Sequence, residues 1–260
     1  MSTLSNSPDQ LDARDWIAGL EKGLNIIEAF DAAHPRLTAS EAGARCGMTR
    51  TAARRYLKTL THLGYMGTDG KMYWLTPRIL RLGHAYLESA RLPRLVQPFL
   101  QRITSGTDEI AYLGVLDGAD TVFIGRSGLN RHTASGYLPG TRLPAQVTAA
   151  GMVMLACGAV QAMDAWLNTH ELQSFTSYTI PTKKQLRAHL LNVKRQGWAI
   201  SEEQLELNFR GIAVPLLDRQ SLVHGAISMT MPINREDTDY ALNRVLPVLQ
   251  EVARNLRPLL

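Results

Sequence analysis

Apolar positions in the first sixty residues recur at the spacing of amphipathic helices. The segment 19–33 carries apolar residues at helical intervals, namely Leu20, Leu24, Ile27 and Phe30. A second helix is expected to begin after Thr38, because Thr38 and Glu41 form the T-x-x-E pattern of a capping box. Gly47 then supplies the left-handed turn that ends it.

The third expected helix, 50–62, begins after Thr49 and ends before Gly64. One stripe of this helix is apolar and consists of Ala53, Tyr56, Leu57 and Leu60. The opposite face is polar and basic and consists of Arg50, Thr51, Arg54, Arg55 and Lys58. A short helix, a glycine turn and a helix with a basic face come one after another in the order of a helix-turn-helix, whose second helix enters the major groove of DNA.

A β-hairpin is expected directly after this helix. Two short β-prone runs within 65–75 flank Asp69-Gly70, a dipeptide typical of hairpin turns, and such a hairpin forms a wing. DNA contacts are therefore expected from the two helices and the wing, at Thr38, Ser40, Thr49, Arg50, Thr51, Arg54, Arg55, Lys58 and Lys71. The alternative is a helix pair that only packs, with its basic face in water.

The second half of the chain changes to apolar runs typical of strands. Helices are expected after Pro77 and Pro93, where they link the basic N-terminal segment to this second half. Further elements are expected as strands at 110–116, 121–125, 131–137, 211–217 and 222–230, and as helices at 149–157, 161–168, 183–196 and 235–257. Strand runs with segregated helices indicate an α+β fold with an antiparallel sheet. The predicted parts are a disordered tail (1–15), a winged helix-turn-helix (16–76), a linker helix (77–92) and a C-terminal domain (93–260).

The positive charge is concentrated in one segment. Between Arg36 and Arg81 nine basic residues accompany only Glu41 and Asp69, a surplus of +7 in a chain whose net charge is +5. A concentrated surplus of this kind favours a polyanionic partner. A solvated basic face with no partner is the alternative.

Composition narrows the class of protein further. With 45% hydrophobic and 20% charged residues the chain is typical of globular proteins, and no apolar run approaches the length of a membrane span. The polar start lacks the features of a secretory signal, and the distant Cys46 and Cys157 favour a reducing cytoplasm. The sequence has no HExxH, Walker or dinucleotide motif, and its histidines lack ligand spacing, so we expect no enzyme, metal or cofactor.

Several ordered segments resemble IclR-type bacterial transcriptional regulators. In the N-terminal half they are GLNIIEAF at 23–30, LTASE at 37–41 and TRTAARRYL at 49–57. In the second half they are GTRLPA at 140–145, TAAG at 148–151 and ELNFRGIAVP at 206–215. The resemblance spans nearly the whole chain from about residue 19. AFDAAHPRLT at 29–38, together with GTRLPA, is most similar to the branch that controls protocatechuate and 4-hydroxybenzoate catabolism.

The resemblance implies a winged helix-turn-helix joined by a helix to a GAF-like effector domain. It also implies homodimers or homotetramers on double-stranded promoter DNA and a small organic acid as effector. The similar branch makes an aromatic carboxylate such as 4-hydroxybenzoate or protocatechuate the expected effector, in control of an aromatic catabolic operon. An aliphatic acid, pyruvate-like or glyoxylate-like, is the alternative.

The helix that begins at Thr148-Ala149-Ala150-Gly151 suits a carboxylate, because backbone N–H groups point outward from a helix start and its small side chains leave them accessible. The resemblance places effector oxygens at Ala149 and Ala150; the alternative is that these small residues only allow tight packing. The resemblance also assigns the following positions to the effector pocket: His132, Ser135, Ser201, Gly211, Ser228 and Thr230. Two cations that could pair with an acid are Arg126 and Arg210.

Each of these other positions also has a structural interpretation. Ser201 and Gln204 form a second capping-box pattern, so Ser201 is either a helix cap or an effector contact. His132 is either structural or a partner of a carboxylate or phenol. Arg126 and Arg210 bind the acid or form structural ion pairs, and Ser228 and Thr230 share one face of a strand.

Two positions depart from the family pattern. Many relatives have Gly where this chain has Asn208, and Cys or Ser where it has Gly211. The missing side chain at Gly211 enlarges the expected pocket, whereas Asn208 restricts a local turn.

A protein-interaction module that uses the winged fold without DNA is the rival outside this class, and the basic helix face argues against it. Under the regulator hypothesis, effector binding shifts the population of dimer or tetramer arrangements and so changes half-site spacing or the contact with RNA polymerase.

Overall fold

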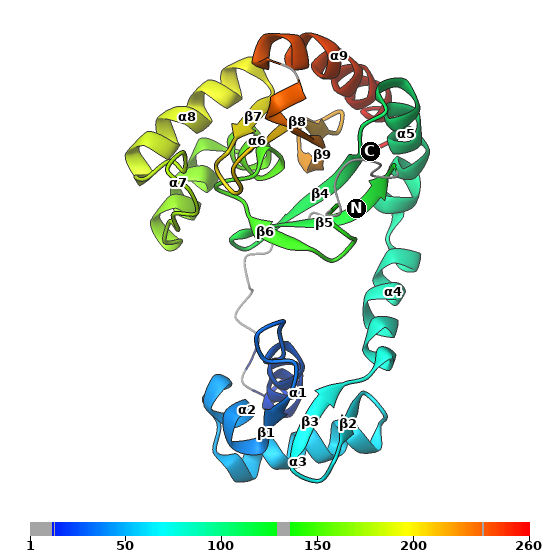
Figure 1. The fold of residues 1–260 in the computed structure, drawn as a ribbon, viewed down its shortest axis with the longest axis vertical. Coiled ribbons are helices and arrows are strands. Elements are labelled where there is room, and N and C mark those ends of the chain that lie inside the picture. Colours follow the sequence, from blue (N-terminus) through cyan, green and yellow to red (C-terminus); the bar gives the residue numbers. More distant parts are fainter. Residues whose placement is uncertain (1–11, 13, 129–135, 236) are drawn as a thin grey trace. The chain divides into compact units, whose positions relative to one another are not determined.

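The computed structural model describes residues 12, 14–128, 136–235 and 237–260. The chain forms two compact units, one that ends at Ala85 and one that begins at Tyr86. Each unit buries hydrophobic residues of its own, and Figure 1 labels the helices and strands of both units.

The N-terminal unit consists of three helices and a small sheet. The helices are α1 (Ala18–Glu28), α2 (Ala39–Arg45) and α3 (Arg50–His62). The strands β1 (Leu37–Thr38), β2 (Met66–Thr68) and β3 (Met72–Leu75) pair in the antiparallel order β1-β3-β2. The predicted hairpin is confirmed, whereas the two-residue β1 has no pattern of its own and depends on β3 for its pairing.

The predicted helix boundaries in this unit result from local chemistry. The Thr38 hydroxyl accepts the Glu41 N–H, and the Glu41 carboxylate accepts the Thr38 N–H at 2.7 Å, which completes the capping box. Gly47, with φ of 63°, forms the turn between α2 and α3. These features act within four residues of one another, which is why they can be recognised without knowing the fold.

The buried face of α1 differs from the expected stripe. Ile26 is fully buried, while Leu20 and Leu24 are 61% and 46% exposed. The helical period was predicted correctly, but the face that enters the core is the one carrying Ile26. On α3 the expected stripe is confirmed, with Ala53 and Leu57 fully buried.

Two helices come after the wing. A 3-10 turn at Pro77–Ile79 leads into α4 (Leu80–Ser89), and α5 (Arg91–Thr107) begins two residues before Pro93. Pro93 therefore lies in the first turn of α5, where its missing N–H removes no helical hydrogen bond. The linker was predicted as one helix over 77–92. In the structure it is a 3-10 turn followed by a helix of ten residues.

The C-terminal unit has a six-stranded antiparallel sheet in the order β6-β5-β4-β9-β8-β7. Its strands are β4 (Ala111–Asp117), β5 (Asp120–Ser127), β6 (Arg142–Pro144), β7 (Ala199–Glu202), β8 (Phe209–Leu217) and β9 (Val223–Pro232). The α+β class and the antiparallel sheet are thus confirmed. The short β6 and β7 were missed, and most of the predicted strand 131–137 lies outside the described residues.

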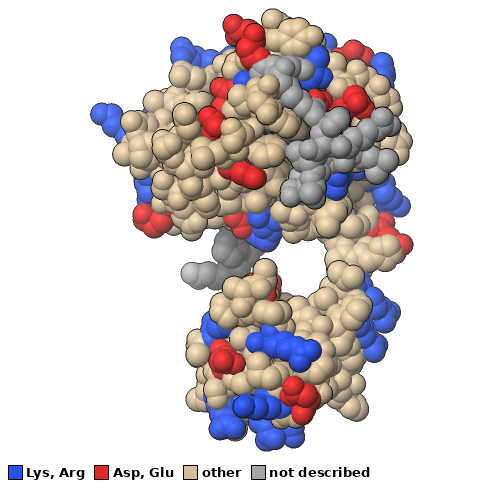
Figure 2. All heavy atoms as spheres, viewed as in Figure 1, with Lys and Arg blue, Asp and Glu red and all other residues tan. Residues whose placement is uncertain are grey.

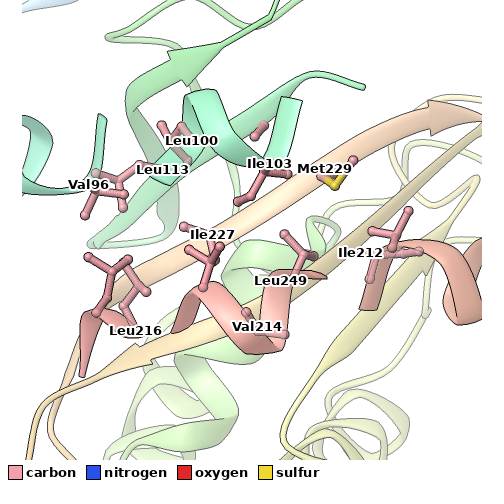
Figure 3. Packing of buried hydrophobic residues seen from close by; sticks show 14 of the residues in the cluster. Val96, Leu100, Ile103, Leu113, Ile212, Val214, Leu216, Ile227, Met229 and Leu249 are labelled. Carbon is pink, nitrogen blue, oxygen red and sulfur yellow. The ribbon is translucent and has the colours of Figure 1, made fainter. Parts of the chain in front are cut away.

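Helices cover both faces of this sheet. The helices α5 and α9 (Thr238–Leu256) pack on one face, where Leu100, Ile227 and Leu249 are fully buried (Figure 3). The other face carries α6 (Ala149–Cys157), backed by α7 (Val160–Thr169) and α8 (Lys183–Gln196). Side chains along β8 alternate between the two cores, with Ile212 on the α9 side and Ala213 on the α6 side.

The position of α6 depends on a glycine in its first turn. A Cβ atom at Gly151 would lie 2.3 Å from the Ala145 carbonyl oxygen and 2.4 Å from the Ala145 Cα. Both are backbone atoms and cannot move aside as a flexible side chain would. Only glycine therefore lets the segment before α6 fold back against the helix.

We predict that Gly151→Ala lowers the free energy of unfolding by about 1–3 kcal/mol, because the added methyl group overpacks a backbone contact. Urea denaturation of the full chain, followed by circular dichroism, measures this loss. The control is Gly106→Ala in α5, where a Cβ meets nothing within 4 Å and the change should stay below about 1 kcal/mol. Equal losses in the two variants would contradict the packing constraint.

Candidate functional site

The basic side chains of α3 form an exposed face on the N-terminal unit. Arg50, Arg54, Arg55 and Lys58 are exposed on α3, opposite the buried Ala53. Among the described residues none of these four cations forms an ion pair, so their charge is available to a partner. Figure 2 shows several Lys and Arg side chains at the surface of this unit.

The polar residues predicted at the helix starts act first as caps. The Thr49 hydroxyl accepts the Ala52 N–H at 3.2 Å, just as the Thr38 hydroxyl caps α2. A capping hydroxyl uses its oxygen as acceptor and still has its own hydrogen to donate, for example to a phosphate. Thr51 on α3 and Ser40 on α2 are exposed.

Lys71 is exposed at the tip of the wing, directly after the Asp69-Gly70 turn. The Asp69 carboxylate accepts the backbone N–H groups of Met72 and Lys71, at 2.7 and 3.0 Å. These two hydrogen bonds hold the pKa of Asp69 below its usual value. The wing tip is therefore ordered by its own acidic residue, which leaves the Lys71 ammonium group at the surface.

Not every basic residue of the charged segment is available in this way. The Arg45 guanidinium pairs with the Asp31 carboxylate and contacts the His34 ring. Arg36, which was counted only as charge in the sequence, lies with its guanidinium 4.4 Å from the centre of the Trp74 ring. This stacking depends on the pairing of β1 with β3. No sequence pattern near Arg36 predicts that pairing.

A cavity in the C-terminal unit lies between the start of α6 and the β8–β9 part of the sheet. About 460 Å³ of space not filled by protein atoms lies here, and part of it is open solvent. Its walls come mainly from α6, from the four strands β5, β7, β8 and β9, and from the loop 203–208, and they include Ala149, Ala150, Ser201, Gly211, Ser228 and Thr230. With Arg210, which also borders it, seven of the ten predicted effector residues therefore line one cavity.

The start of α6 presents free hydrogen-bond donors to this cavity. Ala149 and Ala150 are 4% and 2% exposed. Thr148 caps the helix by accepting the Gly151 N–H at 3.1 Å. Among the described residues, the N–H groups of Ala149 and Ala150 find no acceptor. A buried N–H without a partner is costly and a helix start favours negative charge, so the start of α6 has the chemistry that suits an anion.

The strand residues position the α6 start and leave it room. The Ser201 hydroxyl, on β7, donates to the Val147 carbonyl at 2.6 Å and so fixes the backbone just before the helix. Because Ser201 lies in a strand, its interpretation as a helix cap is wrong. A Cβ at Gly211 would lie 3.5 Å from the Ala149 Cβ, so the space beside the helix start is kept open by the missing side chain.

One wall of the cavity is aromatic. The Phe123 and Tyr137 rings stack with centres 5.1 Å apart and planes 12° from parallel, and both line the cavity. Tyr112 contacts both rings behind them. Burial, reinforced by Glu206 and Tyr112, raises the pKa of Tyr137 to about 12, so this wall is uncharged at neutral pH.

The two predicted arginines do not converge on the cavity. Arg210 borders it, but its guanidinium binds the Glu202 carboxylate, the Asp237 carbonyl and the Thr238 hydroxyl at the start of α9. Arg210 thus has a structural role, since it points to the face opposite its neighbour Gly211. Arg126, on β5, is not among the residues that line the cavity.

Two further predicted contacts, His132 and Ser135, lie outside the described residues. Asn208, the departure noted in the sequence, has a φ of 67°, and its N–H donates to the Glu203 carboxylate. It therefore takes the left-handed conformation, which glycine adopts most easily and asparagine tolerates better than most other residues. Sequence reasoning treated Gln204 only as part of a cap, yet this residue is buried and lines the cavity.

Across the described ranges, no three or more His, Cys, Asp or Glu side chains gather in a way that would hold a metal ion. Nor does any helix in that part of the chain have the length and apolar character required to cross a membrane.

Comparison with known protein families matches both units. The model described as IclR helix-turn-helix domain matches residues 19–70, and the model described as Bacterial transcriptional regulator IclR C-terminal matches residues 84–257. Together they include the basic face of α3 and the whole described cavity.

Two curated relatives match almost the full chain, and both come from Acinetobacter baylyi. The Pca operon regulatory protein is 40% identical over 250 residues, which cover 95% of this chain and 90% of that protein. The p-hydroxybenzoate hydroxylase transcriptional activator is 38% identical over 259 residues, which cover 98% and 96%.

A solved structure resembles the C-terminal unit. It is a double mutant of the inducer-binding domain of the PobR transcription factor from Acinetobacter, in complex with 3-hydroxybenzoic acid. It is 32% identical, covers 66% of this chain and 100% of the solved domain, and superposes with a TM-score of 0.62.

Proposed function

Because the chain belongs to the IclR family of bacterial transcriptional regulators, we propose that it controls an aromatic catabolic operon in response to an aromatic carboxylate such as 4-hydroxybenzoate or protocatechuate. The single observation that carries this proposal is the pair of buried, unpartnered N–H groups at Ala149 and Ala150 beside an aromatic wall. The N–H pair suits a carboxylate and the wall suits a ring.

Relatives support the aromatic class. The two A. baylyi regulators are named for the pca operon and for p-hydroxybenzoate hydroxylase, and the solved inducer-binding domain holds a hydroxybenzoic acid. In this chain we assign the carboxylate to the Ala149 and Ala150 N–H groups and the ring to the Phe123–Tyr137 side. Gly211, Ser228 and Thr230 complete the sheet side of the cavity, and Ser201 holds the α6 start in place.

The partner of the N-terminal unit is double-stranded promoter DNA, in the bacterial cytoplasm. We assign Arg50, Thr51, Arg54, Arg55 and Lys58 to the major groove and its phosphates, with Thr38, Ser40, Thr49 and Lys71 as flanking contacts. A dimer or tetramer of the chain is the form that binds. Its contact surface includes α4, the helix that follows the wing, where Leu80 is 71% exposed. Effector binding then changes half-site spacing or the contact with RNA polymerase.

We predict that 4-hydroxybenzoate or protocatechuate raises the melting temperature of the full chain, whereas pyruvate and glyoxylate do not. A ligand at a hundred times its dissociation constant stabilises the folded state by about 2.7 kcal/mol. A thermal-shift screen followed by calorimetric titration measures this. Stabilisation by the aliphatic acids alone would contradict the aromatic class.

The variant Ala149→Pro tests the proposed carboxylate position. Proline is well tolerated at the first position of a helix, where it removes only an N–H that has no helical partner. We expect the affinity for 4-hydroxybenzoate to fall about tenfold or more, because one charge-assisted hydrogen bond is lost. Lys183→Pro, at the first position of α8, is the matched control. Unchanged affinity in a folded Ala149→Pro variant would place the carboxylate elsewhere.

We predict that Arg54→Ala and Arg55→Ala each weaken DNA binding and leave effector affinity unchanged. Each lost phosphate contact should reduce the slope of log affinity against log salt by about 0.9. The probe is a fluorescent duplex selected from a random pool by the wild-type protein, read by anisotropy over a salt series. Arg102→Ala, an exposed arginine of α5 in the other unit, controls for the loss of charge. Wild-type slopes in both α3 variants would refute the assignment of this face to DNA.

A further inference from the structure

Gln204 is a buried polar residue of the C-terminal unit that lines the cavity. It is 8% exposed, and its side-chain oxygen Oε1 is buried without a hydrogen-bond partner among the described residues. Its backbone carbonyl is occupied, since it accepts the Thr179 hydroxyl at 2.7 Å. A buried amide oxygen with no partner is destabilising, so a ligand group is the natural partner for it.

The strand pairing sets the position of Gln204 along the cavity. The start of α6 lies over Gly211, as the short distance from Ala149 shows. The backbone N–H of Glu203, the residue before Gln204, donates instead to the carbonyl of Phe209, which lies two residues before Gly211 on β8. Two strand residues span roughly 7 Å, which is comparable with the distance between the two ends of a para-substituted benzoate.

Charge sets the direction in which an acid lies in this cavity. The free N–H groups and the dipole at the start of α6 attract an anion. The loop that carries Gln204 also carries Glu206, an exposed carboxylate at the cavity, and the Gln204 Oε1 is itself an acceptor. Both repel a second negative group. The end of the ligand near Gln204 is therefore neutral and supplies a hydrogen to donate.

We propose that Gln204 is a specificity residue whose side-chain oxygen accepts a hydrogen bond from a ring hydroxyl opposite the effector carboxylate. This inference rests on the proposed aromatic acid and narrows it to hydroxylated acids. When the bound acid has no ring hydroxyl, the buried amide oxygen of Gln204 has no hydrogen-bond partner, and the free energy lost by its desolvation is not recovered. We therefore expect benzoate to bind more weakly than 4-hydroxybenzoate.

The loop that carries Gln204 is held in place independently of any ligand. Thr176 donates its hydroxyl to the Glu203 carbonyl at 2.6 Å, next to the Thr179 bond to Gln204. The segment 173–179 is in turn joined to Gln146, whose amide exchanges two hydrogen bonds with the Gln173 backbone. The amide of Gln204 is thus presented by a fixed backbone, as discrimination requires.

The test is calorimetric titration of the full chain with 4-hydroxybenzoate, benzoate and 4-fluorobenzoate, the last being similar in size to the first but unable to donate. We expect the wild type to bind 4-hydroxybenzoate about tenfold or more tightly than the other two. In Gln204→Leu this preference should shrink to about threefold or less. The matched control, Gln161→Leu on the exposed surface of α7, should retain it.

The outcomes separate this inference from the proposed function. If the three acids bind the wild type equally, or if a folded Gln204→Leu variant keeps the preference, the role of Gln204 is refuted and the aromatic effector stands. If none of the three binds, the proposed effector class is refuted and the role of Gln204 with it. Melting curves establish that Gln204→Leu is folded, and because the substitution removes an unpartnered polar atom, we expect no loss of stability without ligand.

Discussion

The close approach of α6 to the backbone before it is the constraint on which the ligand site depends. Gly151 packs against the Ala145 backbone, and the Ser201 hydroxyl donates a hydrogen bond to the Val147 carbonyl. These two contacts fix the backbone of the segment before α6. With that segment fixed, Ala149 and Ala150 are buried, and their N–H groups have no acceptor in the described part of the chain. Small side chains at the helix start and none at Gly211 then leave space for a ligand where these donors point.

The N-terminal unit differs from the C-terminal unit, because the groups that we assign to DNA are exposed and its hydrophobic core is small. The capped starts of α2 and α3 and the turn at Gly47 fix the two helices against each other. The α3 stripe around Ala53 and Leu57 is buried, which forces the arginines outward. In this unit the basic face is a consequence of core packing, and its charge adds affinity for a polyanion without helping the fold.

The features that could be predicted from the sequence are those that depend on neighbouring residues. Capping threonines, the wing turn and the bounds of α6 and α8 belong to this group. Short strands such as β7 could not be found, because they depend on partners in distant segments, and for that reason Ser201 was open to interpretation as a cap. Arg210 could not be assigned for a different reason. Alternation along β8 predicts that Arg210 and Gly211 lie on opposite sides of the sheet, but only the structure shows which of the two lies on the α6 side.

Residues with no partner are harder still to predict, since no motif marks an atom that lacks a contact. Gln204 became a candidate only when its burial was known, and Leu20 and Leu24 became surface residues only when Ile26 was seen to occupy the core.

The regulatory function that we propose requires that a ligand in the C-terminal cavity changes how the N-terminal unit binds DNA. The most direct measurement is the affinity of the full chain for a selected DNA duplex at fixed salt, with and without saturating 4-hydroxybenzoate, together with transcription from the promoter that carries this duplex. We expect the ligand to change one or both, and any change in DNA affinity to be matched by an equal change in ligand affinity when DNA is present. A ligand that binds the cavity but alters neither would contradict the proposed function.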